Sequence, residues 1–151
     1  FDAVVEPLVR AFAPDVLVTQ LGCDTHASDP LAHLSLTLDD VAVVYARLHA
    51  LAHEAAGGRW LATGGGGYQL VRVVPRAWTL AFAEMTGARL PIDTPMRWQE
   101  LVVARTGETP PRDFDDPSPV LGPDVEPHTR AFAEESVATV RELVLTHHGA
   151  R

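Results

Sequence analysis

Four glycines and a tyrosine in direct succession, residues 64–68, form the segment of this chain best suited to chemistry. They follow a short apolar segment, residues 60–63, and precede a helical pattern that begins near Leu70. Strand-to-helix junctions are where α/β proteins bind ligands, and glycine allows a positive φ and a close approach of the backbone. The hydroxyl of Tyr68 could donate a hydrogen bond to a developing oxyanion. A flexible surface turn explains the glycines equally well, so both interpretations stay open on these residues alone.

The glycines do not form a phosphate-binding loop. A dinucleotide fingerprint that begins at Gly64 requires a glycine at the position of Gln69. One that begins at Gly65 requires a glycine at the position of Leu70. A P-loop requires a lysine after its last glycine, and the chain contains no lysine. The commonest functions of glycine-rich loops are therefore excluded.

A second group of candidate residues lies in the connection over residues 22–36. Its members with metal-binding side chains are Asp24, His26, Asp29 and His33. Asp24 follows a predicted strand, and a carboxylate at such a position could bind a divalent metal. The residues alone favour a different role for Asp24, in which its carboxylate accepts hydrogen bonds from nearby backbone amides in a turn. Asp29 precedes Pro30 and is predicted to brace the loop, and His33 is predicted to lie at the surface. Loop spacing does not force these side chains to converge.

Two strands and three helices are predicted to position these loops. The apolar pattern predicts helices over residues 2–12, 37–56 and 70–86 and strands over residues 16–21 and 60–63. Pro75 lies within the first turns of the third helix, so its regular part is predicted to follow that residue. Thr37 is the predicted N-cap of the second helix. The alternation predicts a parallel sheet with helices on both faces, and the apolar run over residues 16–21 predicts a strand that is buried on both faces. Both loops then lie at the same edge of the sheet.

The C-terminal part of the chain is less regular. A helix is predicted over residues 95–106, and an amphipathic helix over residues 128–148. Six prolines between positions 107 and 127 predict an irregular segment there. We therefore divide the chain into residues 1–106, 107–127 and 128–151.

The composition limits the classes of protein to consider. Of 151 residues, 46% are hydrophobic, and no run approaches the roughly 20 apolar residues of a membrane span. The net charge of −8 argues against a nucleic-acid-binding surface. Cys23 is the only cysteine, which excludes an internal disulfide and fits the reducing cytoplasm. Because the first residue is Phe1 and not Met, we expect the true N-terminus to lie upstream.

Four separated segments resemble the C-terminal part of the histone deacetylase family, in the order and spacing of that family. They are residues 14–24, 28–31, 64–68 and 76–79. Residues 72–79 are most similar to the bacterial acetoin utilization branch, and residues beyond 95 are similar to its C-terminal extension. The resemblance implies a three-layer α/β fold of the arginase/deacetylase type, with a mostly parallel sheet flanked by helices. Residues 1–106 would be the C-terminal part of that domain.

The resemblance also implies roles for single residues. Asp24 matches the second of two aspartates that, together with a histidine, hold a zinc or iron ion in the family. Tyr68 matches the tyrosine that hydrogen-bonds the substrate carbonyl and the tetrahedral oxyanion. Leu31 matches an apolar residue at the rim of the acyl-lysine tunnel, and Gly66 and Gly67 match glycines of its floor.

The family's other metal ligands, and the histidine pair that acts as general base and acid, lie upstream of the matched part. His26 stands where the family varies and is not expected to replace them, so we expect the chain alone to be inactive. For the complete protein, the resemblance implies metal-dependent deacetylation of acetylated proteins or small amides, with Zn²⁺ or Fe²⁺ as the cofactor and a link to acetoin or acetate metabolism. Deacetylation of acetylpolyamines and a binding module that lost the chemistry are the alternatives. No nucleic acid or membrane partner is expected.

Overall fold

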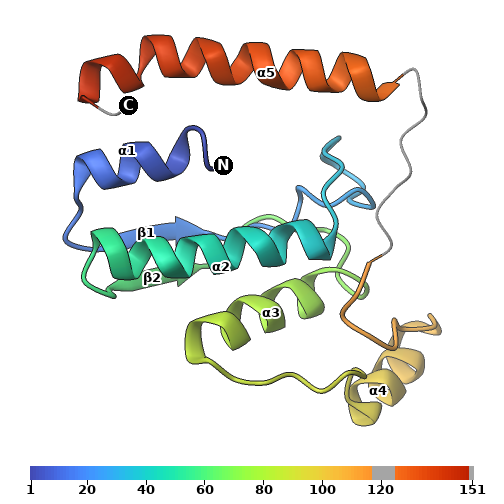
Figure 1. Cartoon of the computed structure of the whole chain (residues 1–151). Helices are drawn as coiled ribbons and strands as arrows, with labels where there is room; N and C mark the ends of the chain where they lie inside the picture. Colours follow the sequence, from blue (N-terminus) through green and yellow to red (C-terminus); the bar gives the residue numbers. More distant parts are fainter. Residues whose placement is uncertain (117–124, 150–151) are drawn as a thin grey trace. The chain divides into compact units, whose positions relative to one another are not determined.

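The computed structural model describes residues 1–116 and 125–149. Its elements in chain order are α1 (Val5–Phe12), β1 (Leu17–Gln20), α2 (Leu38–Ala55), β2 (Trp60–Thr63), α3 (Val74–Thr86), α4 (Met96–Thr106), α5 (Val125–Leu143) and the 3-10 helix η1 (Leu145–His148) (Figure 1). The predicted alternation of helix and strand in the first half of the chain is confirmed. Over the described ranges, no helix is long and apolar enough to cross a membrane.

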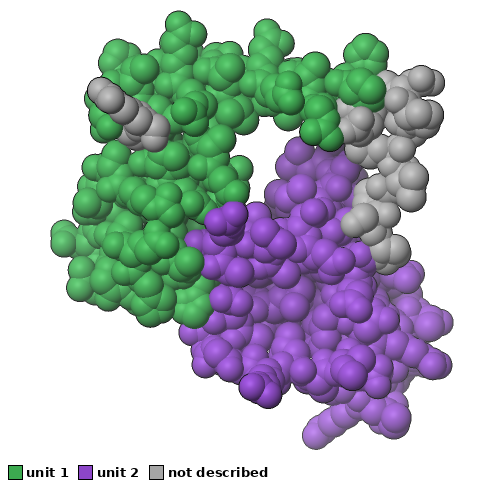
Figure 2. Space-filling view, in the orientation of Figure 1, with its two compact units in different colours: residues 1–17, 48–61, 119–151 green, residues 18–47, 62–118 purple. Residues whose placement is uncertain are grey.

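The chain divides into two compact units (Figure 2). The first contains residues 1–17, 48–61 and 119–151, and the second contains residues 18–47 and 62–118. Buried apolar side chains of the first unit include Leu17, Leu48, Leu51 and Leu145, and those of the second include Leu21, Leu38, Tyr45 and Val73. The loops that follow β1 and β2 both belong to the second unit.

β1 and β2 pair as a two-stranded sheet. The N–H of Leu17 donates to the carbonyl of Arg59 at 2.9 Å, and the N–H of Leu21 donates to the carbonyl of Thr63 at 2.8 Å. Donor and acceptor positions advance along both strands in the same direction, so the pairing is parallel, as predicted.

The prediction that both faces of β1 are buried is wrong. Val18 of β1 is 61% exposed and Leu61 of β2 is 54% exposed. Successive side chains of a strand point to opposite faces of the sheet. In the described part of the chain, the face of the sheet that carries Val18 and Leu61 is exposed to solvent, whereas the opposite face is more buried.

α1 begins later than predicted, at Val5 and not at residue 2. α3 begins at Val74, close to the predicted start of its regular part after Pro75. Pro75 lacks an N–H and fits the first positions of a helix, where no intrahelical bond is lost. Ala13, with a φ of 49°, ends α1 directly before Pro14.

The C-terminal helix differs more from its prediction. α5 begins at Val125, inside the segment predicted to be irregular, and ends at Leu143, before η1. The part of the predicted irregular segment over residues 117–124 lies outside the described residues. The division into residues 1–106, 107–127 and 128–151 stays a prediction.

α2 begins with a capping box. The hydroxyl oxygen of Thr37 accepts a hydrogen bond from the N–H of Asp40 at 3.2 Å. A carboxylate oxygen of Asp40 accepts in return from the N–H and the hydroxyl of Thr37, each at 2.8 Å. This exchange satisfies amide groups that the start of a helix leaves unpaired. The predicted N-cap is confirmed.

Replacing Thr37 by alanine removes the hydroxyl that accepts from Asp40, and it should destabilise the protein by about 0.5–2 kcal/mol. We expect this loss as a lower free energy of unfolding of the full-length protein, measured by chemical denaturation. Thr37→Ser keeps the hydroxyl and serves as the control, with a much smaller change expected. Equal losses in the two variants would contradict the capping role.

Candidate active site

The loops that follow β1 and β2 lie side by side. The N–H of Cys23 donates to the carbonyl of Gly66 at 2.6 Å, just beyond the last hydrogen bond of the sheet. The indole N–H of Trp78 in α3 donates to the carbonyl of Leu21 at 2.9 Å, which attaches α3 to the end of β1. The prediction that both loops leave the same edge of the sheet is confirmed.

Two of the glycines are required by close packing. A Cβ atom on Gly66 would overlap the carboxylate of Asp24. Gly67 has a φ of 143°, and a Cβ atom there would lie 2.9 Å from a methyl group of Val74. Residues with side chains rarely adopt this φ, so glycine lets the loop pass between Asp24 and α3. A flexible surface turn would not need glycine at these positions.

Asp29 is the buried carboxylate that joins the two loops. Its Oδ2 atom accepts a hydrogen bond from the backbone N–H of Tyr68 at 2.9 Å. Its Oδ1 atom accepts from the N–H groups of Leu31 and Ala32, at 2.9 and 3.1 Å. Burial raises the pKa of this carboxyl, but the three N–H donors outweigh burial and hold the pKa below its usual value. Asp29 is ionised at neutral pH, and the prediction that it braces the loop is confirmed.

Tyr68 combines a fixed backbone with an accessible side chain. Its N–H is held by Asp29, whereas the residue is 50% exposed. Its hydroxyl forms no hydrogen bond with the described part of the chain. Leu31, whose N–H is held by the same carboxylate, is 64% exposed. The carboxylate of Asp29 therefore holds the backbone of both Tyr68 and Leu31, while the tyrosine and leucine side chains are exposed to solvent.

Asp24 is half-buried beside the glycine loop. No hydrogen bond from the described residues reaches its carboxylate. The residues alone favour Asp24 as a turn carboxylate that accepts from nearby backbone amides. In the structure, Asp29 and not Asp24 has this role. Both carboxylates contact the glycine loop, one beside Gly66 and the other at Tyr68.

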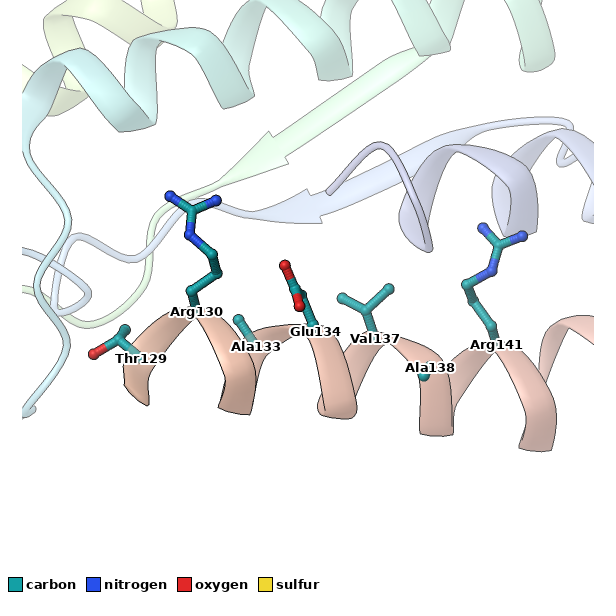
Figure 3. Close-up of a pocket in the computed structure, with 7 residues that line it drawn as sticks. All are labelled: Thr129, Arg130, Ala133, Glu134, Val137, Ala138 and Arg141. Carbon is teal, nitrogen blue, oxygen red and sulfur yellow. The ribbon is translucent and has the colours of Figure 1, made fainter. Parts of the chain in front are cut away.

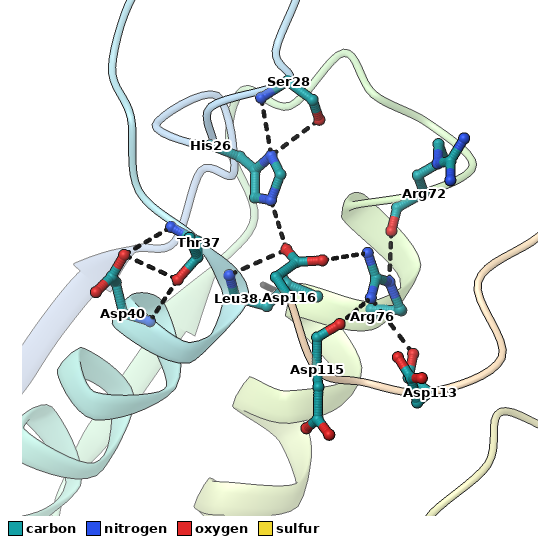
Figure 4. A network of polar contacts seen from close by, with 10 residues as sticks. All are labelled: His26, Ser28, Thr37, Leu38, Asp40, Arg72, Arg76, Asp113, Asp115 and Asp116. Carbon is teal, nitrogen blue, oxygen red and sulfur yellow. Dashed lines mark hydrogen bonds and ion pairs between the residues drawn. The ribbon is translucent and has the colours of Figure 1, made fainter. Parts of the chain in front are cut away.

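The histidines of this loop do not complete a metal site. Nε2 of His26 lies 2.6 Å from a carboxylate oxygen of Asp116, and Nδ1 accepts from the N–H and the hydroxyl of Ser28 at 3.1 and 2.9 Å (Figure 4). His33 is exposed, as predicted. Within residues 1–116 and 125–149, no three His, Cys, Asp or Glu side chains are grouped so that they could hold a metal ion. The loop therefore supplies carboxylates and not a full ligand set.

Sequence reasoning missed Asp116 and Arg76 as partners of this loop. Asp116 follows His26 by 90 positions and stands in the segment predicted to be irregular. Its carboxylate also pairs with Arg76 of α3 at 3.0 Å. The only local signal is the run of acidic residues at 113, 115 and 116, which does not indicate a partner.

A hollow along α5, in the first unit, is not a candidate active site. Its lining consists of Thr129, Arg130, Ala133, Glu134, Val137, Ala138 and Arg141 (Figure 3). All of these side chains belong to one helix, so they cannot enclose a ligand as the walls of a binding pocket do.

Comparison with known proteins identifies relatives of the chain. Residues 1–85 match the family model of the Histone deacetylase domain. Acetoin utilization protein AcuC of Bacillus subtilis (strain 168) is 38% identical over 137 residues, which cover 88% of this chain and 34% of that protein. Acetoin utilization protein AcuC of Staphylococcus xylosus is 38% identical over 99 residues, which cover 65% of this chain and 26% of that protein. The chain spans about a third or less of the length of the curated relatives it matches.

A solved structure shares the fold. The crystal structure of an HDAC homolog from Aquifex aeolicus matches with a TM-score of 0.50 and 22% sequence identity, over 83% of this chain and 37% of that chain. At this identity the likeness concerns the fold alone. The predicted α/β fold of the arginase/deacetylase type is confirmed.

The hydrogen bonds of Asp29 predict which amides lose protection when it is replaced. In the full-length protein, Asp29→Ala leaves the N–H groups of Leu31, Ala32 and Tyr68 without their acceptor, so their hydrogen exchange should accelerate by about tenfold or more. Asp39→Ala removes an exposed carboxylate from the same unit and should leave these three amides unchanged. Unchanged exchange in Asp29→Ala would mean that other contacts join the loops.

Proposed function

This chain belongs to the histone deacetylase family, and we propose that the complete protein hydrolyses the amide bond of acetylated lysine side chains. One observation carries the proposal: the backbone of Tyr68 is fixed by Asp29 while its hydroxyl stays accessible, where the two loops join. Amide hydrolysis needs a donor to the developing oxyanion and an activated water. This edge of the sheet offers the donor, together with the carboxylates of Asp24 and Asp29.

Tyr68 is the proposed oxyanion donor. Asp29 holds the backbone N–H of Tyr68 without a substrate present, and a donor placed in advance needs less reorganisation when charge develops. Leu31 is held by the same carboxylate, so it stands at a fixed place relative to the donor. We propose Leu31 as the apolar rim, and Gly66 and Gly67 as the floor, of the path that receives the aliphatic part of the lysine side chain.

A divalent metal ion, Zn²⁺ or Fe²⁺, is the proposed cofactor. When bound, such an ion lowers the pKa of its water from about 15.7 toward about 7. Carboxylates are suitable ligands, and the resemblance implies Asp24, which is half-buried and accepts no hydrogen bond from the described residues. Asp29 is the second candidate, because it is ionised, buried and bonded to the backbone of Tyr68.

The proposal concerns the complete protein. A catalytic zinc site has three protein ligands, and no three His, Cys, Asp or Glu side chains of the described residues are grouped so that they could hold a metal ion. We propose that the other ligands, and the groups that transfer protons, come from the part of the domain that this chain does not contain. That the chain alone is inactive stays a prediction.

The proposed substrates are acetylated proteins in the cytoplasm, with a link to acetoin or acetate metabolism. The names of the relatives from Bacillus subtilis and Staphylococcus xylosus support the link to acetoin. Acetylpolyamines are the alternative substrates. Assays with an acetyl-lysine peptide and with acetylspermidine, run in parallel on the complete protein, separate the two.

Replacing Tyr68 by phenylalanine tests the oxyanion donor. In the complete protein, Tyr68→Phe should lower kcat toward an acetyl-lysine peptide by about 10²–10³. KM should change less, because the hydroxyl acts on charge that develops after the substrate has bound. Tyr45→Phe, which removes the only other tyrosine hydroxyl of the chain from a buried position in α2, should retain activity per folded enzyme. Turnover near that of the wild type in Tyr68→Phe would refute the assignment.

Replacing the two carboxylates separately tests the metal ligand. The assignment of Asp24 predicts that Asp24→Asn loses bound metal, measured by elemental analysis of the purified complete protein, while Asp29→Asn retains it. Asp39→Asn is the control and should retain the metal. Loss of metal from Asp29→Asn alone would transfer the ligand role to Asp29. Full metal content in both loop variants would show that this loop does not bind the ion.

A further inference from the structure

A cluster of polar contacts joins residues 113–116 to the loop of the candidate site (Figure 4). At its centre is Arg76 of α3, whose side chain is only 5% exposed. Nη2 of Arg76 donates to Oδ1 of Asp116 at 3.0 Å. Nη1 donates to the backbone carbonyls of Asp115 and Asp113, at 3.1 and 3.4 Å. Arg76 therefore fastens residues 113–116 to the first turn of α3.

The second carboxylate oxygen of Asp116 contacts two further elements. It lies 2.6 Å from Nε2 of His26, and it accepts at 3.2 Å from the N–H of Leu38, the first residue of α2. Burial raises the pKa of Asp116, but the hydrogen bond from His26 and the charge of Arg76 outweigh burial and hold the pKa below its usual value. An ionised carboxylate thus bridges α3, the start of α2 and the loop over residues 22–36.

His26 connects this carboxylate to the candidate site. Because Nδ1 of His26 accepts from the N–H of Ser28 at 3.1 Å, the ring proton is on Nε2, which donates to Asp116. The carbonyl of His26 accepts from the N–H of Asp29 at 2.9 Å. The carboxylate of Asp29 accepts in turn from the N–H of Tyr68 at 2.9 Å. A continuous path of contacts therefore runs from Asp116 to the backbone of Tyr68.

We propose that Asp116 is a positioning residue of the active site, which holds the loop through His26 so that Asp29 can fix Tyr68. The inference rests on the proposed function, since this positioning affects turnover only if Tyr68 takes part in catalysis. It goes beyond the family match, because Asp116 lies outside residues 1–85.

The kinetic test uses two neighbouring aspartates of the complete protein. Asp116→Ala should lower kcat by about tenfold to a hundredfold, since small displacements of a catalytic group have effects of this size, and KM should change little. Asp115→Ala is the matched control, because Asp115 contacts Arg76 only through its backbone and its side chain is exposed (Figure 4). It should retain the wild-type kcat. Equal values of kcat in the two variants would overturn the proposal.

Combining Asp116→Ala with Tyr68→Phe distinguishes a positioning role of Asp116 from a role in general stability. In Tyr68→Phe, the hydroxyl to be positioned is gone, so adding Asp116→Ala should not lower kcat further. A merely structural role of Asp116 would lower kcat by the same factor in both backgrounds, and that result would also overturn the proposal.

A third measurement does not depend on activity. Hydrogen exchange of the Tyr68 amide should be faster in Asp116→Ala than in Asp115→Ala, and equal rates would overturn the proposed path. If Asp116→Ala does not fold, His26→Ala and His26→Gln replace it, because glutamine keeps an N–H donor for Asp116 and should protect the Tyr68 amide better than alanine does. If the complete protein has no deacetylase activity, the proposed function fails, and the exchange rates still test the path.

Discussion

The candidate site depends on one buried anion that collects three backbone amides. Asp29 accepts from two amides of its own loop and from the amide of Tyr68 in the other loop. These amides are partly buried, and N–H groups that lose both water and an acceptor are costly, so a single carboxylate holds the two loops in this geometry. Because the hydrogen bonds engage backbone atoms, the side chains of Tyr68 and Leu31 stay available at the surface.

Close backbone packing supports the same arrangement from the other side of the glycine loop. The N–H of Cys23 donates to the carbonyl of Gly66, and a Cβ atom on Gly66 would overlap the carboxylate of Asp24. Gly66 and Gly67 therefore allow the loop backbone to pack closely against Asp24 and Val74, and they do not serve to make the loop flexible. A site built this way has fixed groups before a substrate arrives, and preorganised groups are the ones that stabilise developing charge most effectively.

Local features of the structure could be predicted from the sequence, whereas its long-range contacts could not. β2 and the N-cap Thr37 were predictable, because strand pattern and N-cap chemistry are encoded in a few adjacent residues. The burial of Val18 was predicted wrongly, since an apolar run does not tell which face of a sheet is covered. The link between His26 and Asp116 spans 90 positions and has no local signature. The roles of Asp24 and Tyr68 stay predictions from the resemblance.

The end of the family match is not the end of the scaffold that holds the site. The matched residues stop at 85, but the compact unit that contains both loops extends to residue 118. Within it, Asp116 neutralises the buried charge of Arg76, a residue inside the match that has no other carboxylate partner among the described residues. An uncompensated buried guanidinium is strongly destabilising, so the segment around Asp116 and the matched part of the domain are energetically coupled. A minimal version of this domain, cut at the limit of the match, would lose the partner of Arg76 and the anchor of His26 together.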